Sequence, residues 1–123
     1  MPKDDPKPVS IKLHQKSRLL EVEYDNGRQF QFSTEFLRVY SPSADVRGHG
    51  PGQGVLQTGK ENVSISSIEP MGNYAIKLHF DDGHDTGIYS WPYLYDMGIN
   101  MQQYWQDYLD ALKRAGHIRK HDA

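Results

Sequence analysis

A run of five residues, Asp81-Asp82-Gly83-His84-Asp85, gathers much of the chemistry that this sequence could perform. Carboxylates and imidazoles bind metal ions and transfer protons. His79-Phe80-Asp81 also imitates the first half of a two-histidine, one-carboxylate iron site, for which His117 or His121 could supply the distant histidine. That chemistry needs an open site inside a sizeable barrel, and this chain is too short for one. We therefore expect a strand that ends in a turn here.

The three aspartates of this run could act as general acids or bases. A turn is exposed to solvent, so we expect their pKa values to be ordinary, which argues against catalysis. The chain contains no cysteine, and no serine lies in the Gly-x-Ser-x-Gly pattern of a nucleophile elbow. These observations make an enzyme the least favoured class.

A second motif, Gly54-Val55-Leu56-Gln57-Thr58-Gly59-Lys60, fits the first seven positions of a phosphate-binding P-loop. The eighth position requires Ser or Thr to bind magnesium, and here it is Glu61, whose carboxylate would repel phosphate. The alternation in Val63-Ser64-Ile65 predicts a strand, whereas a P-loop leads into a helix. We therefore do not expect a nucleotide site.

The elements that position these residues follow one plan that occurs twice. After a strand at Val9–Leu13, residues 19–24 and 29–32 alternate apolar and polar side chains around the turn Asp25-Asn26-Gly27, and Ser33 can cap a short helix. A duplicated hairpin–helix unit is the interpretation we favour; chance resemblance between two ordinary hairpins is the alternative.

In the second copy, residues 74–80 and 86–89 flank the turn Asp81-Asp82-Gly83, and Ser90 can cap a helix with Pro92 in its first turn. This copy has one more residue between its turn glycine and its capping serine than the first copy has. The turn residues Asp81, Asp82 and Gly83 are therefore expected to have a structural role.

A three-residue loop with a glycine bulge suits both hairpins, because it places apolar side chains on one face. In the first hairpin it pairs Val22 with Phe30 and Leu20 with Phe32. In the second it pairs Phe80 with His84, Leu78 with Thr86 and Ile76 with Ile88. His84 then leans toward the inner apolar face, and His79 faces Asp85 on the outer face.

The last element is a helix from about residue 100 to 115, in which aromatic and aliphatic side chains recur at helical spacing. Asn100 is a suitable N-cap and Gly116 a suitable stop. Its aromatic stripe should pack on the sheet, although a groove for a partner is the alternative. The predicted fold is therefore α+β: a mainly antiparallel sheet from two similar β-hairpin–short-helix units, with this amphipathic helix packed on it.

Length and composition limit the remaining possibilities. The 123 residues suggest one domain, over residues 9–118, between a disordered, proline-rich lead-in at 1–8 and a frayed tail at 119–123. The net charge of −2, with dispersed basic residues, argues against nucleic-acid binding. No stretch reaches the ~18 apolar residues of a membrane span. The lack of cysteine suits a cytoplasmic protein.

Five blocks of the sequence carry a resemblance to a known family: Phe36–Ser43, the Gly48–Gly54 loop, Ile68–Ala75, Asp81–Trp91 and Tyr93-Leu94. They resemble the gamma-butyrobetaine hydroxylase-like N-terminal domain family, over roughly residues 10–116. The resemblance implies a short bacterial protein of uncharacterised function. In other proteins this domain is fused to iron- and oxoglutarate-dependent hydroxylases and to ATPases of iron–sulfur cluster assembly.

The resemblance also implies that His84 occupies the position of a zinc ligand in the hydroxylases of this family. In the hydroxylases the domain is similar to a zinc-binding module, in which three cysteines and the histidine of the Asp-Gly-His block hold the metal. The matching cysteine positions hold Ser41, Ser43 and Val46 here, so His84 alone remains. Serine hydroxyls do not replace thiolates as zinc ligands. We therefore expect His84 to be kept for packing or hydrogen bonding.

Three functions fit these observations. The first is an accessory or interaction domain without its own catalysis, which contacts a protein partner through His49, His79, Asp85 and Trp91. The second is a protein that binds iron or zinc, linked to iron–sulfur cluster assembly or an oxygenase system, with His84, His49, Asp45 and the turn aspartates as its ligands. The third is a small enzyme with a site around His84.

Overall fold

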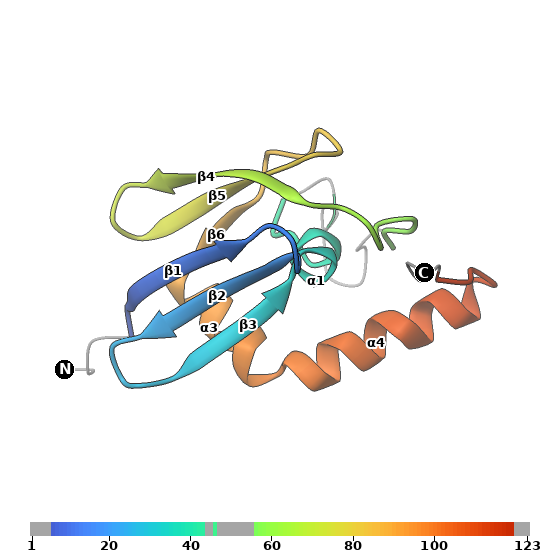
Figure 1. Cartoon of the computed structure of the whole chain (residues 1–123). Coiled ribbons are helices and arrows are strands. Elements are labelled where there is room, and N and C mark those ends of the chain that lie inside the picture. Colours follow the sequence, from blue (N-terminus) through green and yellow to red (C-terminus); the bar gives the residue numbers. More distant parts are fainter. Residues whose placement is uncertain (1–5, 44–45, 47–55, 120–123) are drawn as a thin grey trace.

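The computed structural model describes residues 6–43, 46 and 56–119, which form two three-stranded antiparallel sheets and three helices (Figure 1). The first unit contains β1 (Pro8–His14), β2 (Leu19–Tyr24), β3 (Gln29–Ser33) and α1 (Thr34–Val39). The second contains β4 (Ile65–Met71), β5 (Ala75–Phe80), β6 (Ile88–Ser90) and α3 (Trp91–Ile99), and α4 (Met101–Arg114) follows. The predicted α+β fold is confirmed, and each unit includes one more strand than a hairpin.

The two capping serines act as predicted. Ser33 Oγ accepts a hydrogen bond from Phe36 N at 3.0 Å, and Ser90 Oγ accepts one from Tyr93 N at 3.3 Å. A side-chain acceptor at this position satisfies a backbone N–H that the first helical turn leaves unpaired. The same local chemistry therefore starts α1 and α3.

The predicted register is confirmed in the first hairpin, where Val22 pairs with Phe30 and Leu20 with Phe32. In the second hairpin, Phe80 N donates to His84 O at 3.0 Å, as the predicted pairing of these two residues requires. Beyond the turn, the predicted register is wrong by one residue. Ile76 pairs with Tyr89, and Lys77 pairs with Ile88. The extra residue of this copy lies in the unpaired segment 84–87, so Tyr89 is buried and Ile88 is 39% exposed.

Each unit's helix lies against the other unit. Figure 1 shows α3 behind the first sheet. The centroid of the Tyr95 ring lies 5.0 Å from the centroid of the Tyr24 ring. Tyr24 Oη donates to Trp91 O at 2.8 Å, and Tyr89 Oη donates to Leu37 O at 2.5 Å. The inner side chains of both sheets thus contribute to one core.

Helix α4 packs on this core through Met101, Tyr104 and Trp105, and on α1 through Tyr108 and Leu112. The predicted placement of the aromatic stripe against the sheets is therefore confirmed. No helix in the described part of the chain is long and apolar enough to cross a bilayer.

The predicted ends of α4 differ in outcome. The stop at Gly116 is confirmed, because Gly116 N donates to Lys113 O and His117 N to Leu112 O, as in a Schellman motif. Asn100 is the N-cap residue, as predicted, but its side chain makes no capping hydrogen bond; its amide donates to the Asp96 carboxylate at 2.9 Å. Asn100 is also the C-cap residue of α3, and its side chain donates to Asp96 in the last turn of that helix.

Ordered contacts extend to both ends of the described chain. Lys7 O accepts a hydrogen bond from Asp25 N at 2.8 Å, and Pro8 begins β1. Arg119 bonds Glu35 through its side chain. Residues 1–5 and 120–123, which belong to the expected lead-in and tail, lie outside the described residues.

Candidate site at the second hairpin turn

The turn between β5 and β6 is joined to the chain that precedes β4. Asp81 N donates to Ser64 O at 2.8 Å, and Asp81 Oδ1 accepts from Ser64 N at 3.1 Å. Gly83 has a φ of +91°, a conformation that favours glycine. The aspartate and the glycine therefore hold the shape of the turn.

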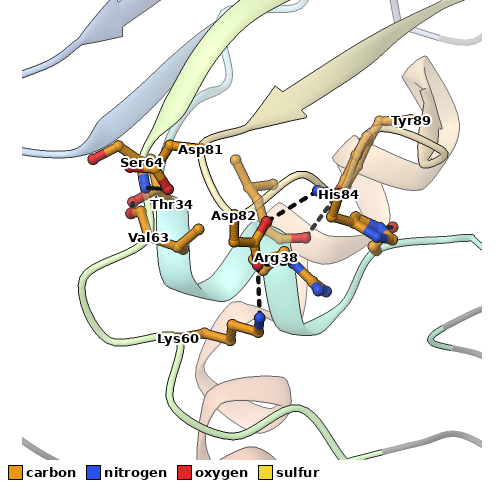
Figure 2. A network of polar contacts seen from close by, with 11 residues as sticks. Thr34, Arg38, Lys60, Val63, Ser64, Asp81, Asp82, His84 and Tyr89 are labelled. Carbon is orange, nitrogen blue, oxygen red and sulfur yellow. Dashed lines mark hydrogen bonds and ion pairs between the residues drawn. The ribbon is translucent and has the colours of Figure 1, made fainter.

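Asp82 is the centre of a charged cluster (Figure 2). Its Oδ2 accepts hydrogen bonds from Arg38 Nε at 2.9 Å and Lys60 Nζ at 2.6 Å, and its Oδ1 accepts one from His84 N at 3.1 Å. Burial opposes ionisation of Asp82, but the bonds from Lys60, His84 N and Arg38 outweigh it and lower the pKa of the carboxyl to about 2. The expectation of an ordinary pKa is therefore wrong for Asp82.

Arg38 brings its charge into this cluster from the end of α1. Only 9% of its side chain is exposed, and its Nη1 is buried without a hydrogen-bond partner among the described residues. A buried cation is costly unless it is paired, so Arg38 depends on Asp82. The cluster consequently fastens the second turn to the helix of the first unit.

His84 lies on the other side of the turn from Lys60. Its Nε2 is 2.9 Å from Ser41 Oγ, and its ring centroid is 6.0 Å from that of Phe80. Ser41 is fully buried, so His84 reaches inward, and its tautomer decides which group donates the proton. This contact joins the turn to the chain that follows α1.

The other positions that the resemblance matches to zinc-binding cysteines are buried. Ser43 Oγ is 2.7 Å from Thr86 Oγ1, and Ser43 and Val46 are 7% and 5% exposed. One imidazole, two hydroxyls bonded to protein groups and an apolar side chain do not fit zinc, which takes thiolate, imidazole or carboxylate ligands. In residues 6–43, 46 and 56–119, no three His, Cys, Asp or Glu side chains lie close enough together to hold a metal ion.

The outer face of the second sheet holds His79, and Asp85 lies beside it. His79 Nε2 is 3.0 Å from Glu69 Oε1, and His79 Nδ1 is 3.9 Å from Asp85 Oδ2. Trp91 does not lie on this face: it is the first residue of α3 and packs against the core, and its Nε1 donates to Asn73 O at 2.9 Å. His49 and Asp45 lie outside the described residues.

Sequence reasoning missed Arg38 and Lys60, the two cations that bind Asp82. Lys60 was singled out only as part of the incomplete P-loop; the structure shows no helix after it and directs its side chain to Asp82. A basic residue within the apolar stretch Phe36–Val39 was a signal for Arg38. It could not identify the acid, because the pairing depends on how the two units pack.

Comparisons with known proteins agree with this architecture. The family described as "Gamma-butyrobetaine hydroxylase-like, N-terminal" matches residues 11–95. An NMR solution structure 51% identical in sequence has a TM-score of 0.81, covering 100% of this chain and 98% of the other. A second NMR structure is 46% identical, with a TM-score of 0.82 and coverage of 98% and 94%.

A crystal structure from Acidithiobacillus ferrooxidans ATCC 23270 is 38% identical, with a TM-score of 0.66, covering 77% of this chain and 98% of the other. It is described as a protein with unknown function of the DUF971 family. No curated protein matches the chain.

Proposed function

Since this chain belongs to the gamma-butyrobetaine hydroxylase-like N-terminal domain family, we propose that it is a non-catalytic accessory domain that binds a protein partner. The partner contacts the outer face of the second sheet. We define this face by Ser67, Glu69, Lys77, His79 and Ile88, which pair side by side on β4, β5 and β6.

The proposal rests on a difference between equivalent positions of the first and second sheets. On the first sheet Glu21 pairs with the exposed Gln31, whereas on the second sheet Lys77 pairs with Ile88, which is 39% exposed. Apolar side chains surrounded by polar ones suit a protein interface, in which the centre is dry and the rim is wet. The partner therefore presents an apolar side chain to Ile88, with polar groups toward His79 and Asp85.

The groups at the second turn support a structural role for that turn. Asp82 is held ionised by two cations, and His84 is bonded to Ser41. A general acid or base works best with a pKa near the working pH, and a pKa of about 2 does not meet this condition. The side chain of His84 contacts the buried Ser41, so an enzyme with a site around His84 is the less favoured alternative.

Metal binding, linked to iron–sulfur cluster assembly or an oxygenase system, is the other alternative. His84 is its one described ligand among the positions that the resemblance matches to zinc ligands. Elemental analysis of untagged protein tests it, and one equivalent of bound iron or zinc would favour it over the proposed role. A cytoplasmic location is part of the proposal and rests on the absence of cysteine.

The test of the proposed role begins with capture of partners from the native host and continues with the purified partner. Ile88→Asp should weaken the reconstituted complex at least about tenfold, because it places a charge in the apolar centre. Gln31→Asp, the matched change on the first sheet, should leave the dissociation constant within about twofold. Equal effects of both variants, or no complex with any purified candidate, would refute the proposed face.

A further inference from the structure

A second polar cluster lies between α1 and α4, away from the outer face of the second sheet. Its centre is Glu35, a carboxylate only 4% exposed, which accepts a hydrogen bond from Tyr108 Oη at 2.7 Å. Burial and this bond to Glu35 raise the pKa of Tyr108, so the phenol stays protonated and donates. A buried carboxylate with one neutral donor still requires a cation.

The cation is Arg119, which lies in the segment expected to be a frayed tail. Arg119 Nε donates to Glu35 Oε2 at 2.8 Å and Nη2 donates to Oε1 at 2.5 Å, so the guanidinium meets both carboxylate oxygens. Its Cζ lies 5.3 Å from the centroid of the Trp105 ring. A planar guanidinium can bind a carboxylate at two points and also lie over an aromatic ring, and an ammonium cannot form the same fork.

The segment that carries Arg119 follows α4 and is largely exposed. Helix α4 ends at Arg114, and no helix or strand includes residues 117–119. Ile118 is 84% exposed, and a quarter of the Arg119 side chain is exposed. The guanidinium is therefore a group on a short tether, seated in a receptor built by two packed helices.

We propose that Glu35, Trp105 and Tyr108 form a binding site for the guanidinium of an arginine side chain, which Arg119 fills in cis. When Arg119 leaves, the site takes an arginine from another protein. The tether gives Arg119 a high effective concentration, so an arginine in trans competes poorly until the tail is displaced. This site lies on the helices and the proposed partner face lies on the second sheet. A result that refutes one of them therefore does not refute the other.

The test opens the site with Arg119→Ala and titrates in N-acetyl-arginine amide, following the Trp105 indole N–H by NMR. Arg114→Ala is the matched control, because it removes an exposed arginine from the last turn of α4. N-acetyl-lysine amide tests for a general ionic effect. Arg119→Ala/Glu35→Gln removes the carboxylate that the guanidinium binds and keeps a similar shape, while Glu61, whose charge also acts on Arg119, stays in place. If Arg119→Ala does not fold, Arg119→Gln removes the charge and keeps a longer side chain.

We expect Arg119→Ala to bind the arginine probe at least about tenfold more tightly than the wild type or Arg114→Ala does. The lysine probe should bind at least about tenfold more weakly than the arginine probe, and the double variant should bind neither. A folded Arg119→Ala or Arg119→Gln protein that does not bind the arginine probe overturns the proposal. Equal binding of arginine and lysine, or binding that survives Glu35→Gln, overturns it as well.

Discussion

The two hairpin turns have the same backbone and different side-chain partners. Gly27 N donates to Tyr24 O at 3.0 Å, and Gly83 N donates to Phe80 O at 3.1 Å. In each turn the middle side chain also accepts from a backbone N–H two residues later: Asn26 from Arg28 at 3.0 Å and Asp82 from His84 at 3.1 Å. The chain therefore builds one turn twice.

The difference begins at the middle residue. Asn26 Nδ2 donates to Tyr95 Oη of α3 at 3.0 Å, whereas Asp82 binds Arg38 of α1 and Lys60. Each turn thus contacts the helix of the other unit, one through a neutral pair and one through a charged cluster. A cluster of charged residues in a turn can therefore hold two units together and need not indicate a reaction.

The largest expected effect comes from exchanging the middle residues. Asp82→Asn keeps the acceptor for His84 N but leaves Arg38 without its acid, so we expect a loss of about 2 to 3 kcal/mol in the free energy of unfolding. Asn26→Asp should change it by less than about 0.5 kcal/mol. Urea denaturation of both variants measures this. Similar losses in the two variants would contradict the assigned difference.

The pH dependence should show the same contrast. The pKa of Asp82 is lowered to about 2 by folding, from an ordinary value of about 3.9. The stabilisation is therefore complete above the ordinary value and is lost as the pH falls from about 4 toward 2. We expect about 1 to 2 kcal/mol of the wild-type unfolding free energy to disappear in this window. In Asp82→Asn that contribution should be missing, so the two proteins should converge in stability at low pH.

Alanine at the turn glycines tests the backbone equivalence. Gly27 and Gly83 have φ angles of +87° and +91°, and an added Cβ would meet nothing within 4 Å at either position. Gly27→Ala and Gly83→Ala should each cost about 1 kcal/mol, through the left-handed backbone alone. Thermal unfolding of both variants, compared with the wild type, checks this. Costs that differ by more than about 1 kcal/mol would show that the turns are not equivalent.

The smallest expected effect is at the first turn's side-chain contact. Tyr95→Phe removes the hydroxyl that accepts from Asn26 and keeps the ring against Tyr24. Because the lost bond is exposed, we expect a change of no more than about 0.5 kcal/mol by urea denaturation. A loss as large as that of Asp82→Asn would reverse the ranking of the two turns.

Local patterns predicted the parts of the fold that depend on neighbouring residues. Both capping serines, the first hairpin's register and the stop at Gly116 follow from short-range chemistry. The second register was missed because the extra residue lies in segment 84–87, and the pattern of side chains alone did not show where pairing resumes. A Cβ on Gly87 would lie 2.3 Å from Ser41 Oγ, a close approach that depends on the first unit.

The candidate site was predicted less well, for the same physical reason. The turn residues and the inward direction of His84 follow from the hairpin itself. Arg38 and Lys60 reach Asp82 from other segments, and Arg119 reaches Glu35 from the end of the chain. These pairs form only because the units and helices pack, so spacing along the chain does not identify them.

The central claim is that the partner binds the outer face of the second sheet, while the His84 contacts hold the fold. The direct measurement is the dissociation constant of the purified complex for the wild type, Ile88→Asp and Ser41→Ala, with each variant's folding checked by circular dichroism. Ser41→Ala removes the hydroxyl beside His84. We predict that Ile88→Asp weakens binding at least about tenfold and that Ser41→Ala changes it less than about twofold. Loss of binding in a folded Ser41→Ala protein, with Ile88→Asp unaffected, would contradict the claim.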